Sequence, residues 1–196
     1  MAFFTRPQLE SMGFAALGEN VLISDRASIY GAARIRIGNH VRIDDFCVVS
    51  AGAGGIRFGS YVHVACFCSL IGAAEIVMED FSGLSSRVAV YSSSDDYSGR
   101  FMTNPMVPTE FTSVDSRPVH LMKHVIVGAG TIVLPGVVIG EGSAVGALSL
   151  VSKSLDGFGI YSGVPTKRIK ERHRGLVEHE AALRAALRAA LLKSEP

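Results

Sequence analysis

The feature that most constrains this chain is a six-residue repeat, which is clearest between Leu121 and Val151. In this stretch every sixth residue is a medium-sized aliphatic residue, and the fifth place of each unit holds a small or β-branched one. The aliphatic residues are Leu121, Val127, Val133, Ile139, Val145 and Val151. A six-residue unit cannot bury its apolar side alone, so it must stack on copies of itself. The repeat predicts an all-β solenoid in which three short strands and three turns form one coil.

The repeat also runs through the first half of the chain. Sixes begin at Leu17, and a few extra residues follow every third unit, so that new coils start at Ile37, Phe58 and Met78. Because successive strand residues point to opposite faces, the first and fifth places face inward and the sixth place faces outward. Cys47 and Cys68 both hold fifth places, and we expect them to lie inside the coil as small apolar residues.

Both ends of the chain carry helix signals. Thr5 and Gln8 form a capping-box pattern, which predicts a short helix from Arg6 to Met12 within an N-terminal cap of residues 1–16. Such a helix would cover the open strand edges of the first coil. In residues 171–196 leucine recurs at helical spacing, which predicts a C-terminal α-helix. These leucines are Leu176, Leu183, Leu187 and Leu191.

Composition excludes several classes of protein. The net charge is +1, so no basic excess predicts binding to nucleic acid or to an anionic membrane surface. No apolar run approaches the roughly 20 residues of a membrane span, and the opening residues lack the features of a secretion signal. The three cysteines are an odd number at repeat positions, which favours a reducing cytoplasm. We expect one domain, with the β-helix at residues 17–170.

Residues 91–119 interrupt the repeat once. This segment contains the run SSSDDYSG and several prolines, but no histidine. Long excursions from a compact coil are uncommon and are usually functional. We therefore expect polar residues of this loop to contact a substrate. The candidates are Asp95, Asp96, Tyr97 and Asn104.

The sixes, the loop, and the segments VGALSLVSKS and SGVPTKRIK together resemble the hexapeptide-repeat acyltransferases. The most similar branch contains galactoside, maltose and serine O-acetyltransferases and the acyltransferases of surface-polysaccharide sugars. The resemblance implies a left-handed parallel β-helix. The left hand comes from the resemblance alone, because the general rule for parallel crossovers would favour the right hand. It also implies a homotrimer with three active sites, each in a cleft between neighbouring coils. From its apolar stripe we expect the C-terminal helix to stabilise this trimer. Each site would transfer acetyl from acetyl-CoA to a hydroxyl or amino group of a sugar or nucleotide sugar.

The same resemblance places the coenzyme A contacts. Carried over residue by residue, contacts to the pantetheine arm fall at Ile126, Ala129, Ala147 and Ser152. Small side chains there let a ligand approach the backbone. Cationic side chains suit the nucleotide phosphates. The candidates for the phosphates are Lys153, Lys167 and Arg168.

Acyl transfer needs a base for the proton of the nucleophile and donors for the developing oxyanion. Galactoside-type relatives use a loop histidine, at whose place this chain has Asp95. One alternative base is His63, which resembles the histidine before an I-A-P-like unit in amino-sugar N-acetyltransferases. Another is Asp95 or Asp96 itself, although a free carboxylate with a pKa of about 3.9 is a weak base toward a hydroxyl and suits an amine acceptor better.

A third arrangement pairs the two candidates. In it His63 of one subunit is the base, and Asp95 of the neighbour orients the imidazole across the cleft. The absent loop histidine also leaves open a different class of protein, a repeat scaffold that has lost catalysis. A zinc enzyme is not indicated, because the spacing of the histidines gives no three-ligand signature, and we expect no metal. The histidines considered are His40, His63, His120 and His124.

Overall fold

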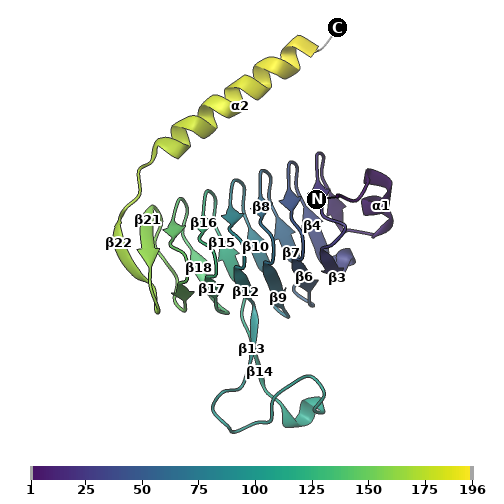
Figure 1. Ribbon diagram of the computed structural model, residues 1–196, viewed down its shortest axis with the longest axis vertical. Helices are drawn as coiled ribbons and strands as arrows, with labels where there is room; N and C mark the ends of the chain where they lie inside the picture. Colours follow the sequence, from purple (N-terminus) through teal and green to yellow (C-terminus); the bar gives the residue numbers. More distant parts are fainter. Residues whose placement is uncertain (1, 195–196) are drawn as a thin grey trace.

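The computed structural model describes the backbone of residues 2–194 and the side chains of residues 2–190. Its body is a parallel β-solenoid whose three sheets form the sides of a prism (Figure 1). A short helix lies at the end of the first coil, and a long C-terminal helix leaves the last coil and runs back alongside the prism. The predicted solenoid, the N-terminal helix, the inserted segment and the C-terminal helix are all confirmed. No helix among the described residues is long and apolar enough to cross a membrane.

Each sheet collects one strand from every coil. The first sheet contains β1 (Ala16–Leu17), β4 (Ile35–Ile37), β7 (Ile56–Phe58), β10 (Ile76–Met78), β15 (Val119–Leu121) and β18 (Val138–Ile139). The second contains β2 (Leu22–Ile23), β5 (Arg42–Ile43), β8 (His63–Val64), β11 (Gly83–Leu84), β16 (Ile126–Val127), β19 (Ala144–Val145), β21 (Gly159–Ser162) and β22 (Lys167–Glu171). The third contains β3 (Ser28–Tyr30), β6 (Val48–Ala51), β9 (Ser69–Gly72), β12 (Ala89–Tyr91), β17 (Ile132–Val133) and β20 (Leu150–Val151).

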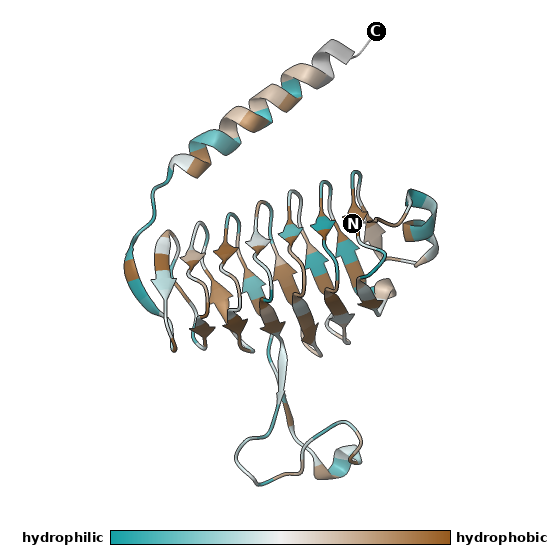
Figure 2. Cartoon of the chain, in the orientation of Figure 1, coloured by the Kyte–Doolittle hydropathy of each residue, from teal (hydrophilic) through white to brown (hydrophobic). Residues whose placement is uncertain are grey.

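The interior follows the predicted parity. Leu17 pairs with Ile37, Ile37 with Phe58, and Phe58 with Met78, so the first places of successive coils stack on one another. From Ile37 to Val151 the first places are almost fully buried, and most fifth places are too, which builds one continuous core. Ala53 and Ala74, fifth places just before extra corner residues, are the exceptions. Figure 2 shows the apolar residues concentrated in the strands of the coil.

Polar and thiol-bearing fifth places are also buried as expected. Cys47 and Cys68 have no exposed surface, and their thiols point to the carbonyl oxygens of Ala65 and Ser85, with Sγ–O distances of 3.0 and 3.1 Å. Thr131, at another fifth place, donates from Oγ1 to a carbonyl oxygen 3.1 Å away. Buried polar groups of this kind are tolerated because the turns of the next coil supply an acceptor.

The N-terminal helix α1 (Arg6–Ser11) closes the first coil. The backbone N–H of Thr5 donates to Oε1 of Gln8 at 2.8 Å, which confirms the capping interaction, and Leu9 is buried against the core. The backbone N–H of Phe4 donates to the carbonyl of Ile23 at 2.9 Å. The helix thus covers the strand edges at this end, as expected.

The C-terminal helix begins within the predicted range of residues 171–196, after one further strand. Lys167–Glu171 forms strand β22, antiparallel to β21, and helix α2 begins only at Gly175 and continues to Ser194. The run KRIKE pairs as a strand because its backbone satisfies the last exposed edge of the second sheet. Lys167 and Arg168, expected at the end of the coil, therefore lie on this added strand.

One corner of the prism carries a stack of aromatic and imidazole rings. Between the first and second sheets, His40, Tyr61, Phe81 and His124 form one stack, with neighbouring ring centroids 4.6 to 5.0 Å apart. All four residues have a positive φ, which places their side chains one above another on successive turns. Helix α2 lies over this corner, since Glu180 bonds to His124.

The insertion is a projecting arm rather than an irregular loop. Strands β13 (Ser93–Asp95) and β14 (Val114–Ser116) pair in antiparallel fashion and carry a tip that includes the 3₁₀ turn η2 (Thr109–Phe111). A further 3₁₀ turn, η1 (Ala32–Arg34), lies at the same corner of an earlier coil. In Figure 1 the arm extends away from the prism at the corner between the third and first sheets.

Candidate active site

One outward row of the second sheet brings predicted site residues together. Sixth-place residues of successive coils are in register, so that His63 pairs with Gly83 and Gly83 with Ile126. His63 and Ile126 flank a hollow of about 280 Å³ that lies over Gly83. Ala65, Leu84, Ser85 and Ser86 complete the lining. The predicted base and one predicted coenzyme A contact thus share a surface.

His63 has a buried carboxylate partner within its own chain. Its Nε2 lies 2.9 Å from Oδ2 of Asp44, and Oδ1 of Asp44 accepts a bond of 2.6 Å from Nε of Arg42. Burial raises the pKa of Asp44, but the bonds from Arg42 and His63 outweigh burial and hold that pKa below its ordinary value. An ionised Asp44 accepts the Nε2–H of His63, which leaves Nδ1 as the basic nitrogen of the neutral ring.

The sequence analysis missed Asp44. The signal was present, because Asp44 lies two residues after the outward-facing Arg42 and so shares its face. Arg42 and His63 both hold sixth places and pair on successive coils, and this pairing brings Asp44 within reach of the imidazole.

Asp95 lies in a different hollow, at the base of the arm. This hollow, of about 570 Å³, is also lined by Asp96, Tyr97 and Ser152. Asp95 is therefore near a predicted coenzyme A contact, but it is not beside His63 of its own chain. A His63–Asp95 pair requires two different subunits.

The other loop candidates are exposed, and two of them shape turns. Asp96 accepts a bond of 2.9 Å from the hydroxyl of Ser98, which holds the pKa of Asp96 below its ordinary value. Asn104 accepts a bond from the backbone N–H of Met106 at 3.0 Å. Tyr97 has 93% of its surface exposed. Such an exposed aromatic ring is available to a ligand or to a second chain.

The remaining coenzyme A candidates lie on the later coils. Ala129 and Ala147 are exposed neighbours at the corner between the second and third sheets, since the carbonyl of Ala129 accepts a bond from the residue after Ala147. Lys153 follows β20 and is exposed. Lys167 and Arg168 lie on β22, at the end of the sheet that carries His63, and Arg168 also pairs with Glu171 at 2.6 Å.

Comparison with known proteins decides the family. No family model matches the sequence. The chain is 50% identical over 184 residues to a dTDP-4-amino-4,6-dideoxy-D-glucose acyltransferase of Escherichia coli, an alignment that covers 94% of this chain and 96% of that enzyme. The chain belongs to the hexapeptide-repeat sugar acyltransferases. Enzymes of this family use acyl-CoA as the donor. The family resemblance is therefore confirmed, and so are the enzyme class and the acyl donor expected from the sequence.

Solved structures of relatives agree with this assignment. AntD, an N-acyltransferase from Bacillus cereus solved with dTDP and 3-hydroxybutyryl-CoA, superposes with a TM-score of 0.91 at 46% identity, covering 95% of this chain and 98% of AntD. A variant of AntD holds dTDP-4-amino-4,6-dideoxyglucose together with coenzyme A. A maltose O-acetyltransferase from Clostridium difficile shares the fold, with a TM-score of 0.58 at 18% identity, covering 86% of this chain and 74% of that one.

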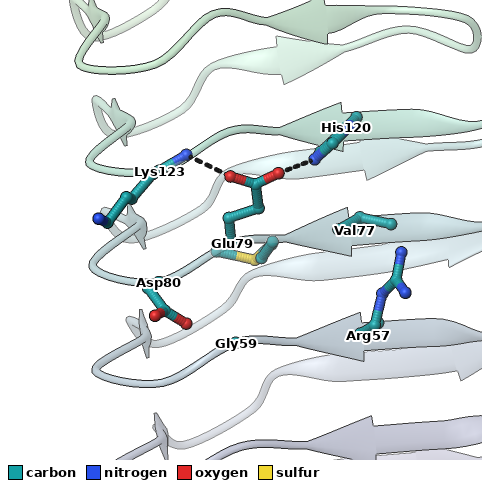
Figure 3. Close-up of a pocket in the computed structure, with 8 residues that line it drawn as sticks. Arg57, Gly59, Val77, Glu79, Asp80, His120 and Lys123 are labelled. Carbon is teal, nitrogen blue, oxygen red and sulfur yellow. Dashed lines mark hydrogen bonds and ion pairs between the residues drawn. The ribbon is translucent and has the colours of Figure 1, made fainter.

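This sugar acyltransferase has a second imidazole–carboxylate pair, on the outward face of the first sheet. Nε2 of His120 lies 2.6 Å from Oε1 of Glu79, whose other oxygen accepts the backbone N–H of Lys123 at 3.0 Å (Figure 3). The pair borders a hollow of about 480 Å³ that Arg57 and Asp80 also line. None of the predicted coenzyme A contacts lines this hollow, so we favour the His63 hollow as the reaction site.

Proposed function

We propose that this chain transfers an acyl group, acetyl in the first instance, from acyl-CoA to the amino group of a dTDP-linked 4-amino-4,6-dideoxy sugar. The observation that carries this proposal is the similarity, over nearly the full length of both chains, to an acyltransferase of that amino sugar. The His63 hollow supplies the base that such a reaction uses. The alternative of a scaffold without catalysis finds no support among these relatives, which are acyltransferases.

The geometry at His63 supports a defined proton path. The amine nitrogen attacks the thioester carbonyl carbon, a C–N bond forms, and the C–S bond breaks. Nδ1 of His63 takes the proton that the nitrogen loses and passes it to the departing sulfur, so that an amide and free coenzyme A result. Asp44 holds the Nε2 side of the ring and stabilises the transient imidazolium, in the role we had expected of Asp95.

The second sheet offers a path for the donor. From Gly83 on β11 the sheet continues through β16, β19 and β21 to the cationic strand β22. Four strand spacings of about 4.8 Å give roughly 19 Å, comparable with an extended pantetheine arm. We propose that Ile126, Ala129 and Ala147 border this pantetheine arm, and that Ser152, which lines the Asp95 hollow, joins them from the neighbouring subunit. The cations proposed for the phosphates are Lys153, Lys167 and Arg168.

A homotrimer would complete the site. The inserted arm of the protein, which carries β13 and β14, projects from its own coil and exposes apolar side chains, of which Tyr97 and Met106 are about nine-tenths exposed. An exposed hydrophobic patch of this kind marks a contact with another molecule. We propose that the arm of one subunit lies beside the His63 hollow of the next. It would bring Asp95 to the cleft and the acceptor contacts Asp96, Tyr97 and Asn104 with it.

We place the enzyme in the cytoplasm and its product in a surface polysaccharide. Cys47, Cys66 and Cys68 are all free thiols, as in proteins of reducing compartments. dTDP-linked amino-deoxy sugars are precursors of the kind that such polymers require.

Turnover of acetyl-CoA with dTDP-4-amino-4,6-dideoxyglucose tests the proposal. The assay follows release of the coenzyme A thiol, and mass spectrometry identifies the amide. We expect His63→Ala to lower kcat by about 100-fold or more. His120→Ala is the matched control, since it removes the imidazole of the other pair. Unchanged turnover of His63→Ala at saturating acceptor would exclude His63 as base, and loss in the control alone would move the reaction to the first sheet.

A further inference from the structure

Gly83 is an anomaly in the outward row of the second sheet. On the strands from β2 to β21 this row carries a side chain at each position except Gly83. The φ of Gly83 does not lie in the left-handed region, so the backbone conformation does not require glycine. A Cβ built there would meet only the carbonyl oxygen of His63, at 3.7 Å.

Other glycines of the coil have a packing reason that Gly83 lacks. A Cβ at Gly59 or Gly128 would come within 2.5 Å of atoms of the next coil, so no side chain fits at either place. Gly83 has open space instead. Glycine weakens a strand relative to a residue with a Cβ, and inside a strand it often marks the close approach of a ligand.

The lining of the gap indicates an uncharged ligand. Ile126 and Ala65 supply apolar walls, and Ser85 and Ser86 add hydroxyl groups at the edge. Among the residues that the structure describes, no arginine, lysine or carboxylate lines the hollow, whereas a diphosphate would need cationic donors. The gap suits a short carbon chain that carries at most a hydroxyl group.

We infer that the gap over Gly83 is the subsite for the acyl chain of the donor, and that the absent side chain sets the longest chain accepted. This inference rests on the proposed function. A pantetheine arm bordered by Ile126 brings the thioester to the adjacent strand, β11, with His63 one strand further on. The carbonyl carbon then lies near the base, and the chain beyond it fills the space where a side chain at position 83 would stand.

Donor selectivity tests the inference. Acetyl-, propionyl- and butyryl-CoA are compared at saturating amino-sugar acceptor for the wild-type chain, Gly83→Ala and Gly83→Val. We expect the wild type to use butyryl-CoA with a kcat/KM within about tenfold of that for acetyl-CoA. Gly83→Val should lower kcat/KM for butyryl-CoA at least about tenfold more than for acetyl-CoA, with Gly83→Ala intermediate.

A matched control separates selectivity from folding. Ala16→Val adds bulk at an outward position on the first sheet, remote from the hollow, and should leave the donor ratio unchanged. The ratio of kcat/KM for butyryl-CoA to that for acetyl-CoA does not depend on the fraction of folded protein. Calorimetry without acceptor measures the affinities of the two donors, and Gly83→Val must lower the affinity for butyryl-CoA more than that for acetyl-CoA.

Three results would overturn the inference. The first is an equal effect of Gly83→Val on all donors, and the second is strong rejection of butyryl-CoA by the wild type. The third is dissociation of the oligomer by Gly83→Val with an unchanged donor ratio, which would make the gap a subunit contact. Failure of the proposed function can be told apart from these three results. In that case the wild type turns over no donor, and the calorimetric selectivity still decides the role of Gly83.

Discussion

Replacing Glu180 with glutamine removes the charge that holds helix α2 on the coil. The Glu180 side chain is 7% exposed and accepts bonds of 2.6 to 2.7 Å from Lys123, His124 and Arg184. Burial raises its pKa, but the bonds from these three partners outweigh burial and lower the pKa from 4.5 to about 2. Glutamine keeps the shape of the side chain and loses the carboxylate.

The shift gives the size and the sign of the effect. A lowering of about 2.5 pKa units at 1.36 kcal/mol each sets an upper bound of about 3 kcal/mol. Lys123 and Arg184 are partly exposed, so water screens the pairs, and we expect about 1.5 kcal/mol. Because the pKa of the folded state is depressed, this stabilisation is complete above about pH 4.5 and is lost as the pH falls toward 2.

Hydrogen exchange of the α2 amides measures the effect. At pH 7 we expect Glu180→Gln to exchange about tenfold faster than the wild type, which corresponds to about 1.4 kcal/mol. In the wild type, protection corrected for intrinsic rates should fall between pH 4.5 and 2, whereas in the variant it should stay flat. Glu178→Gln is the control, since Glu178 lies on the same helix and is exposed. Equal exchange in the two variants would refute the role of Glu180.

Three further substitutions probe the site and the fold. Asp44→Asn should lower kcat by about 100-fold with little change in KM, because the amide no longer holds the imidazole of His63 as the carboxylate does. Leu70→Ala empties a fully buried position of the third sheet, and urea unfolding should show a loss of about 3 kcal/mol. Arg172→Ala removes bonds of 3.0 to 3.3 Å to three turn carbonyls, so limited proteolysis should cut the chain before α2 while the coil stays intact.

The coil was predictable because its six-residue repeat can be recognised within short stretches of the sequence. The alternation of inward and outward places follows from strand geometry alone, and it placed Cys47, Cys68 and His63 on the correct faces. Strand β22 and the pairing within the arm were not predicted, and both depend on distant partners. Strand β22 forms because an open sheet edge lies beside it, and the arm forms a hairpin because its two ends leave adjacent coils.

The site was predictable only in part, for the same reason. His63 and Ile126 meet because both hold sixth places, which the repeat reveals. Asp44 meets His63 through a side-chain contact between two coils, and the conformation of these side chains is not part of the repeat. In the proposed trimer Asp95 reaches the cleft from a neighbouring subunit, and the order of residues in one chain does not encode that distance.

Mixed oligomers of His63→Ala and Asp95→Ala chains test most directly the central claim, an acyl-transfer site shared between subunits, because the proposed trimer brings Asp95 of one subunit to the His63 hollow of the next. His63→Ala and Asp95→Ala chains are purified separately, unfolded together in equal amounts and refolded, and CoA release is measured with the amino-sugar acceptor. If each site takes His63 from one subunit and Asp95 from the next, random mixing restores about a quarter of the wild-type activity. Activity no greater than the mean of the two separate variants would contradict the shared site.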